Sequence, residues 1–268
     1  MPTIPKGVAV VTGASAGIGA IYADRLARRG YDLILVARNQ ARLDEVAKRI
    51  ADTTGRVVKP VAADLNNRAD LKRIETILAA DPSITMLVNN AGVGALAPLL
   101  QSNPDAMEEM IDLNVTALTR LTYAVAPAFV ARGGGTIINI SSVAAIAPEV
   151  LNGVYGGTKA FVLALSQSLY KELANKNVRI QAVLPGATAT NFWDVAGGSL
   201  EHLPSKIVMQ SDDLVDAALA GFDQGELVTI PSLADVADWS AYEAARQKLI
   251  PNLSLSSVPP RYRTAVAA

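Results

Sequence analysis

The residues best suited to chemistry in this sequence are a tyrosine and a lysine four positions apart, Tyr155 and Lys159, with Ser142 thirteen residues before the tyrosine. Side chains at this spacing lie on one face of a helix. An ammonium close to a phenol is expected to favour the phenolate and to lower the tyrosine pKa from its usual value of about 10. Such a phenol can donate or accept a proton near neutral pH. Because Tyr-x-x-x-Lys also arises by chance on helix surfaces, the rest of the sequence has to show whether this pair is functional.

A glycine-rich turn, Gly13-Ala14-Ser15-Ala16-Gly17-Ile18-Gly19, follows the expected first strand at 8–12 and leads into a helical pattern. This order is typical of a dinucleotide site, because glycine allows close approach of a pyrophosphate and the helix N-terminus attracts negative charge. The spacing is G-x-x-x-G-x-G rather than G-x-G-x-x-G. A flexible surface turn would have the same composition.

The second expected strand, 32–37, is followed by Arg38, where an NAD site would place an acidic residue. An acidic side chain there binds the ribose hydroxyls, whereas an arginine can bind a 2′-phosphate through two hydrogen bonds. The alternative is a solvated arginine on a loop. Because Asp and Glu are both missing from this turn, we predict a site for NADP.

Strands and helices alternate up to the last expected strand, with no linker and no internal repeat. This alternation predicts an α/β fold with one doubly wound parallel sheet in three layers, and with ligands at the carboxyl ends of the strands. We expect a single domain over 1–268, a substrate lid around 191–210 and a C-terminal tail from about 250. The expected strands are 8–12, 32–37, 57–61, 85–88, 136–142, 179–184 and 227–230. One helix is expected after the glycine-rich turn and ends at 29, and the other expected helices cover 40–53, 68–80, 105–132, 155–173, 212–222 and 236–249.

Three polar residues near strand ends or within a helix need an explanation. Asp64 follows the third strand and is expected either to accept the adenine amino group or to cap the next helix, and both readings stay open. A structural role is favoured for Asn89 at the end of the fourth strand. Asn114 lies within 105–132, where asparagine is mildly unfavourable in a helix. Its apolar neighbours favour burial, and the alternative is a surface position.

Composition argues against several function classes. A formal net charge of −1 gives no electrostatic case for nucleic acid or an anionic membrane. The absence of cysteine excludes disulfides and thiolate chemistry, and His202, the one histidine, argues against a metal centre and a serine–histidine triad. We recognise no apolar run of about 20 residues and no signal peptide, so the expectation is a soluble cytoplasmic protein.

Taken together, the motifs resemble those of the short-chain dehydrogenase/reductase family over nearly the whole chain, least specifically after about Phe192. The matching pieces, in family order, are Thr12-Gly13-x-x-x-Gly17-x-Gly19, Asn89-Asn90-Ala91-Gly92, Asn114, Ser142, Tyr155-x-x-x-Lys159, and Pro185-Gly186 with Thr190. The resemblance implies a Rossmann fold and an NADP(H)-dependent oxidoreductase acting on a small-molecule carbonyl or alcohol.

The resemblance also implies a role for each matching residue. Tyr155 would be the general acid/base, Lys159 would hold the nicotinamide ribose and lower the tyrosine pKa, and Asn114 would hold a water linking Lys159 to solvent. Ser142, selected over Ser141 by the family spacing, would hydrogen-bond the substrate oxygen. The residues expected to bind NADP are Gly13, Ser15, Gly17, Ile18, Gly19, Arg38, Asp64, Leu65, Asn90, Ala91, Gly92, Tyr155, Lys159, Pro185, Gly186, Thr188 and Thr190.

One region departs from the family pattern. Acyl-carrier ketoreductases carry Asp-Gly-Gly near the last strand, whereas this chain has Thr229-Ile230-Pro231-Ser232, which leaves the subfamily open. Two alternative functions remain. A non-catalytic dinucleotide-binding sensor or scaffold would not need Ser142, Tyr155 and Lys159 together, and Arg38 argues against an NAD-linked catabolic dehydrogenase.

Three loops after strand ends, 93–100, 143–151 and 191–210, should surround the nicotinamide. They are rich in apolar residues and offer one base, Lys206, late in the third loop. We therefore predict a hydrophobic pocket for neutral, fairly bulky ketones, aldehydes or secondary alcohols, unless these apolar residues belong to the core. The apolar helix face after Lys159 predicts a homodimer or homotetramer, the alternative being that this face packs on the sheet.

Overall fold

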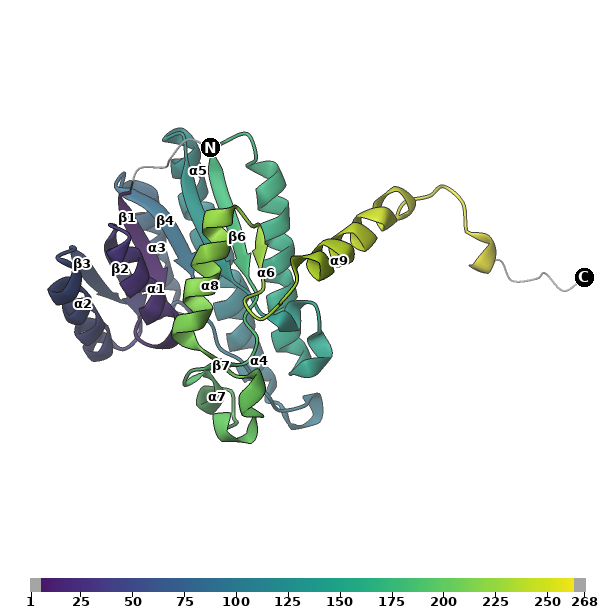
Figure 1. Ribbon diagram of the computed structural model, residues 1–268, viewed down its shortest axis with the longest axis horizontal. Coiled ribbons are helices and arrows are strands. Elements are labelled where there is room, and N and C mark those ends of the chain that lie inside the picture. Colours follow the sequence, from purple (N-terminus) through teal and green to yellow (C-terminus); the bar gives the residue numbers. More distant parts are fainter. Residues whose placement is uncertain (1–5, 263–268) are drawn as a thin grey trace, which may run out of the picture. The chain divides into compact units, whose positions relative to one another are not determined.

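The computed structural model describes residues 6–262, and its main structural element is a parallel sheet (Figure 1). Within these residues the sheet has seven strands in the order β3-β2-β1-β4-β5-β6-β9, and each neighbouring pair is parallel. Its strands are β1 Val8–Thr12, β2 Asp32–Ala37, β3 Val58–Ala62, β4 Ile84–Asn89, β5 Gly135–Ile140, β6 Val178–Val183 and β9 Val228–Thr229. Their apolar runs suit a sheet that is buried on both faces.

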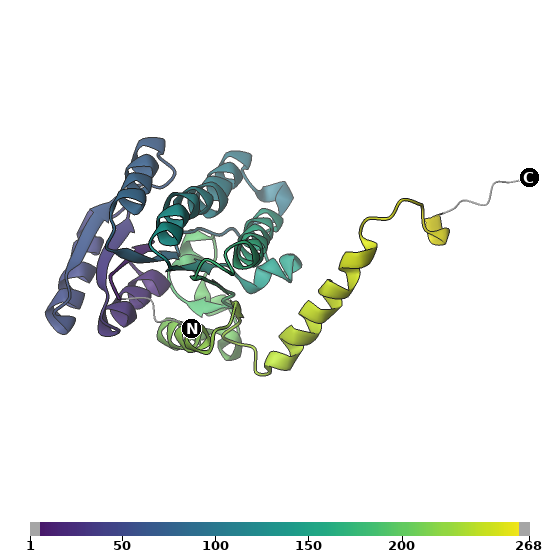
Figure 2. The same ribbon diagram turned by 90° about the horizontal axis from the view of Figure 1, so that it is seen from above.

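Helices cover both faces of this sheet (Figure 2). The apolar sides of α1, α2 and α8 meet one face, and those of α3, α5 and α6 meet the other. The α-helices of residues 6–232 are α1 Gly17–Arg28, α2 Gln40–Thr54, α3 Arg68–Ala80, α4 Pro104–Ile111, α5 Leu118–Ala131, α6 Gly153–Glu172, α7 Phe192–Val195 and α8 Ser211–Gln224. Helix α9, Val236–Leu249, belongs to a second unit described below. The predicted three-layer, doubly wound fold is confirmed.

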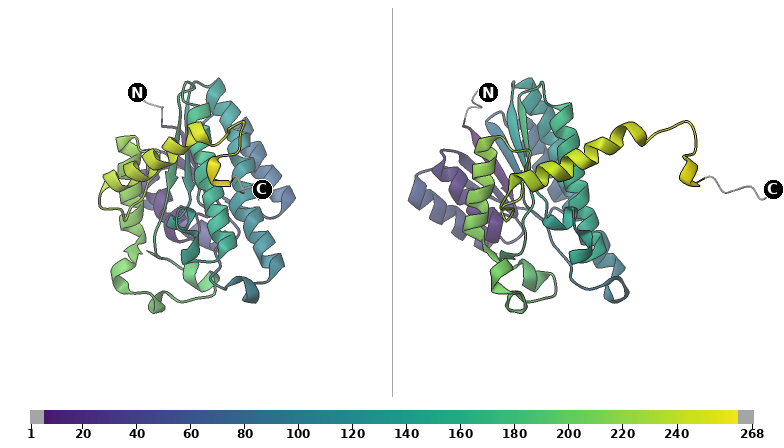
Figure 3. Two further views of the ribbon diagram at one scale, coloured as in Figure 1. Left: turned by 90° about the vertical axis from the view of Figure 1, so that its right-hand side faces the viewer. Right: turned by 45° about the vertical axis from the view of Figure 1, so that its right-hand side comes forward.

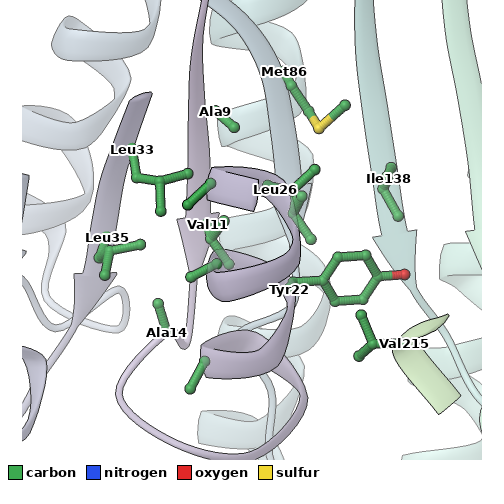
Figure 4. Close-up of a cluster of buried hydrophobic side chains, with 14 of the residues drawn as sticks. Ala9, Val11, Ala14, Tyr22, Leu26, Leu33, Leu35, Met86, Ile138 and Val215 are labelled. Atoms are coloured by element: carbon green, nitrogen blue, oxygen red, sulfur yellow. The ribbon is translucent and has the colours of Figure 1, made fainter. Parts of the chain in front are cut away.

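Two apolar clusters hold the layers together, one on each side of the sheet. In the first, Tyr22 and Leu26 of α1 lie among strand residues such as Ile138, with Val215 of α8 close by (Figure 4). In the second, Phe129 of α5 is completely buried. Strand order reverses between β1 and β4, and such a switch point is where doubly wound sheets bind ligands.

The region 105–132 differs from the single helix that we expected. Helix α4 ends at Ile111, a π-helical segment spans Asp112–Ala117, and α5 follows. A π-helical turn shifts the helical register by one residue, and such segments are frequent at functional sites. Here it contains Asn114, whose side chain is buried as predicted.

Most of the apolar face of α6 packs against the sheet. Leu163 and Leu169 are buried, and Leu165 packs against the second core cluster. Phe161 and Tyr170 stay 39% and 49% exposed. Part of this face therefore packs within the chain, and the homodimer or homotetramer stays a prediction.

The chain divides into two compact units, Met1–Ser232 and Leu233–Ala268. The single domain, the lid around 191–210 and the tail from about 250 stay predictions. The second unit contains α9, at the bounds expected from the sequence, and Asp235 caps it by accepting a hydrogen bond from Ala237 N. Short 3-10 turns follow at Ile250–Asn252 and Pro260–Tyr262. Every helix within residues 6–262 is too short or too polar to cross a membrane.

Candidate active site

The glycine-rich turn between β1 and α1 is packed too closely for side chains. A Cβ on Gly13 would lie 2.8 Å from Nδ2 of Asn90, and one on Gly19 would overlap the carbonyl oxygen of Gly13. Gly13 and Gly17 also have positive φ angles of +66° and +51°, which favour glycine. Asn90 Nδ2 donates to the carbonyl oxygens of Thr12 at 2.9 Å and Gly13 at 3.2 Å. The turn is thereby fixed to the end of β4.

Arg38 is exposed and lines the same cavity as Ser15. A second hollow of about 600 Å³ adjoins this region and shares Ser15 with the cavity. Two bases, Arg42 and Arg49, and two acids, Glu45 and Asp212, line the hollow. Sequence reasoning missed these two arginines, although Arg42, in the first turn of the helix that follows Arg38, could have been considered.

Asn114 joins the loop after β4 to helix α6. Its Nδ2 donates to Val93 O at 2.9 Å and to Thr158 Oγ1 at 3.1 Å, and its Oδ1 accepts from Val93 N at 3.0 Å. Gly92 lies between Asn114 and Lys159, since a Cβ there would be 3.0 Å from Asn114 Oδ1 and 3.4 Å from Lys159 Nζ. Asn114 therefore holds the loop next to the lysine.

The Lys159 ammonium is buried, and its Nζ donates to Ile140 O at 3.0 Å. Burial lowers the pKa of Lys159 from 10.5 to about 8. Its Nζ lies 5.8 Å from the centroid of the Tyr155 ring. The expected pairing of Tyr155 and Lys159 on one helix face is thus present.

The Tyr155 phenol has a pKa that burial raises from 10.0 to about 12, although a hydrogen bond with Ser142 acts in the opposite direction. Its ring packs in an apolar cluster with Met110 and Ala144. The expectation that Lys159 lowers the tyrosine pKa is therefore wrong for the free protein. Removal of the phenol from water outweighs its hydrogen bond with Ser142.

The two adjacent serines have different partners. The Ser142 hydroxyl forms a hydrogen bond with Tyr155. It also accepts a hydrogen bond from Ala144 N at 3.1 Å and donates one to Pro185 O at 3.4 Å. Ser141 Oγ donates instead to the carbonyl oxygen of Lys159 at 2.7 Å. Ser142 is thus the serine placed to share a ligand atom with Tyr155.

A cavity of about 640 Å³ brings most of the predicted site residues together. Its walls include Gly13, Ser15, Gly17, Ile18, Arg38, Asn90, Ala91, Gly92, Ser142, Tyr155, Lys159, Pro185, Gly186, Thr188 and Thr190. The remaining predicted residues, Gly19, Asp64, Leu65 and Asn114, are not part of its wall. Gly19 and Asn114 act behind it through the contacts described above.

Asp64 does not cap α3, which corrects one of its two proposed roles. Asn67 is the cap, and its side chain accepts hydrogen bonds from Ala69 N and Asp70 N. Asp64 accepts from Asn66 N at 3.0 Å in the preceding turn. The side chain of Leu65 is buried in the second core cluster. Contacts of Asp64 and Leu65 with a cofactor stay predictions.

The outer part of the cavity is lined by the expected lid and is largely apolar, although Asn191, Ser199 and His202 also line it. Figure 3 shows the lid segment (green) and the loop after β4 (blue) at the same end of the sheet. Among the described residues lining the cavity, Arg38 and Lys159 alone carry a formal charge, while Lys206 is not in the wall. His202 lies at the rim, a position that the sequence did not suggest. The apolar lid residues in the wall are Phe192, Trp193, Val195, Leu203 and Ile207.

Comparisons with known proteins agree with this arrangement. Residues 7–197 match the family described as short chain dehydrogenase. The chain is 49% identical to a short-chain dehydrogenase from Sphingobium yanoikuyae solved in complex with NADPH, with a TM-score of 0.93 over 96% of this chain and 100% of that one. It is 44% identical to the bulky-bulky ketone specific alcohol dehydrogenase from Comamonas testosteroni, with a TM-score of 0.88 over 96% and 98% of the two chains.

A third relative is the 17-beta-hydroxysteroid dehydrogenase type 3 of Homo sapiens. It is 39% identical over 265 residues, which cover 90% of this chain and 79% of that protein. The chain belongs to the short-chain dehydrogenase/reductase family and is an oxidoreductase.

Proposed function

We propose that this protein is an NADP(H)-dependent oxidoreductase that reduces a neutral, hydrophobic ketone or aldehyde, or oxidises the matching alcohol. The observation that carries the proposal is one cavity with a polar and an apolar part. Tyr155, Ser142 and Lys159 lie on its inner wall, and apolar side chains of the expected lid form most of the outer wall. NADPH, when bound, would supply the hydride.

The proton chemistry falls to Tyr155 and Ser142. Because its pKa is about 12 in the free protein, Tyr155 carries its proton at neutral pH and is ready to donate it to a carbonyl oxygen. The Ser142 hydroxyl would hydrogen-bond the same oxygen and stabilise the negative charge that develops there. In the oxidative direction Tyr155 would accept the proton of the alcohol.

The residues at the switch point fit a dinucleotide phosphate. No described side chain caps α1 at Ala16, so the backbone N–H groups of its first turn suit a pyrophosphate. Exposed Arg38 lies beside Ser15 at the cavity, and Arg42 follows in the adjoining hollow. The guanidinium of Arg38 at the cavity favours a 2′-phosphate, and hence NADP over NAD. Lys159 would hold the nicotinamide ribose.

The apolar outer wall supports a neutral substrate. A binding site for carboxylate or phosphate would offer an arginine or lysine next to the reacting group. Arg38 belongs to the proposed cofactor end, and Lys159 is assigned to the nicotinamide ribose. The ketone-specific relative with 44% identity is consistent with this substrate class.

Steady-state NADPH oxidation, followed at 340 nm with a panel of aryl, cyclic and acidic ketones, tests the proposal. We expect the neutral, bulky ketones to give the highest kcat/KM. If small anionic keto acids are preferred and bulky ketones are inert, the apolar-pocket argument fails. If no carbonyl compound is reduced with NADPH or NADH, a non-catalytic dinucleotide-binding role becomes the better explanation.

A further inference from the structure

The ring of Phe192, the first residue of α7, lies next to the ring of Tyr155. The ring centroids are 5.7 Å apart and the planes are tilted by 52°. On its other side Phe192 meets the ring of Trp193 edge-on, with centroids 5.5 Å apart. Trp193 is buried, and its Nε1 donates to Thr188 O at 2.9 Å. Phe192 is thereby held between the proposed acid/base and a fixed aromatic neighbour.

Gly94, in the loop after β4, provides the space that this ring occupies. A Cβ on Gly94 would overlap Cζ of Phe192 and would lie 2.6 Å from Cε2. Non-bonded carbon atoms pack at about 3.5–4.0 Å, so the ring and a side chain at position 94 exclude each other. Gly94 is not among the glycines with positive φ. Its backbone conformation therefore accepts alanine, and glycine is needed only for the space.

The same loop contacts the lid at a second point. Leu96 N donates to Ala196 O at 3.1 Å, and a Cβ on Gly198 would overlap Cδ1 of Leu96. Leu96, Phe192 and Gly198 all line the cavity. The loop after β4 and the lid therefore close over Tyr155 as one interlocked wall.

We propose that Gly94 and Phe192 form a pair that sets the size of the substrate group accepted beside Tyr155. This inference rests on the proposed function. A carbonyl oxygen bonded to Tyr155 and Ser142 would place one of its two substituents against the Phe192 ring, which makes Phe192 a specificity-determining residue. Gly94 is a positioning residue, because it acts by leaving room for that ring.

If the two residues act as a pair, the effect of one substitution on kcat/KM should depend strongly on whether the other is present. Gly94→Ala must displace the ring and should lower kcat/KM for an aryl methyl ketone by at least about tenfold, because overpacking distorts the wall. In a Phe192→Ala background, Gly94→Ala should lower kcat/KM less than about threefold, because the effects of substitutions at contacting residues are coupled. Phe192→Ala should raise the preference for a diaryl ketone over the aryl methyl ketone by at least about tenfold, since pocket size discriminates on that scale.

Gly153→Ala is the matched control. A Cβ there would meet nothing within 4 Å, and Gly153 is not among the glycines with positive φ. We expect wild-type kinetics. If Gly94→Ala alone does not fold, recovery of folded, active protein in the double variant supports the pair, and failure to recover overturns it.

The fluorescence of Trp193 reports the contact without turnover. Trp193 and Trp239 are the two tryptophans of the chain, so the measurement is made in a Trp239→Phe background. Gly94→Ala should change the Trp193 emission, and this change should be absent when Phe192 is alanine. If the wild type reduces ketones but Gly94→Ala has the same effect on kcat/KM with and without Phe192, the inference is overturned and the proposed function stands. A wild type that reduces no ketone would overturn both.

Discussion

Replacing Lys159 with methionine should stabilise the free protein while removing its activity. Burial lowers the pKa of Lys159 from 10.5 to about 8, so the fold disfavours the charged ammonium. At about 1.4 kcal/mol per pH unit, this difference corresponds to about 3 kcal/mol of lost stability at pH 7. Methionine forfeits the hydrogen bond to Ile140 O, worth about 1 kcal/mol. The expected net gain is about 2 kcal/mol, or a rise in Tm of about 4–8 °C for a chain of this size.

The pH dependence of this gain has a definite sign. A lysine whose pKa is lowered on folding imposes its penalty below about pH 8 and loses it as the pH rises toward 10.5. The gain from Lys159→Met should therefore fall by more than half between about pH 7 and about pH 9.5. Thermal unfolding followed by circular dichroism measures this gain at both pH values.

Lys176→Met, at an exposed lysine, serves as the control and should change stability by no more than about 0.5 kcal/mol. Two results would refute the reasoning. One is a Lys159→Met variant less stable than the wild type at neutral pH. The other is a gain of equal size at both pH values, which would show that the charge of the buried lysine is not its source. The Lys159→Met variant should lose activity whatever its stability, because Lys159 is proposed to hold the nicotinamide ribose.

Two further substitutions test the assignment of the site. Ser142→Ala should lower kcat by about 10²–10³-fold through lost stabilisation of the developing oxyanion, whereas Ser141→Ala, which removes a bond to a backbone carbonyl, should cost far less. Steady-state rates compare the two, and the reverse order would show that Ser141 is the serine facing the substrate. Arg38→Asp should reverse the preference from NADPH to NADH, because a charge-assisted bond worth about 1.5–3 kcal/mol is lost. A wild-type enzyme whose kcat/KM with NADH equals or exceeds that with NADPH would contradict the role of Arg38.

The strands and most helices could be predicted because their signals are local. The runs at 8–12 and 32–37 are apolar and β-branched, and their bounds agree with β1 and β2. The short pair β7 Thr188–Ala189 and β8 Met209–Gln210 was missed. It exists because segments about twenty residues apart meet in register, Thr188 opposite Met209. Two residues carry too little pattern to indicate such a pairing.

The site residues could be identified from the sequence, but the direction of their pKa shifts could not. The spacing of Tyr155 and Lys159 gives their common helix face, yet the direction of the tyrosine pKa depends on how deeply its ring is buried. That burial comes from segments distant in sequence, including Met110 and Ala144. Long-range packing also decides the contact of Phe192 with Gly94.

The central claim is that Tyr155 transfers the proton in a site for NADPH. Tyr155→Phe removes the phenol oxygen and keeps the ring in its apolar cluster. The most direct measurement compares wild type and variant for NADPH binding by titration calorimetry and for single-turnover reduction of a bulky ketone. We predict nearly unchanged NADPH affinity and a rate lowered by about 10²–10⁴-fold. A variant that keeps more than about a tenth of the wild-type rate would contradict the claim.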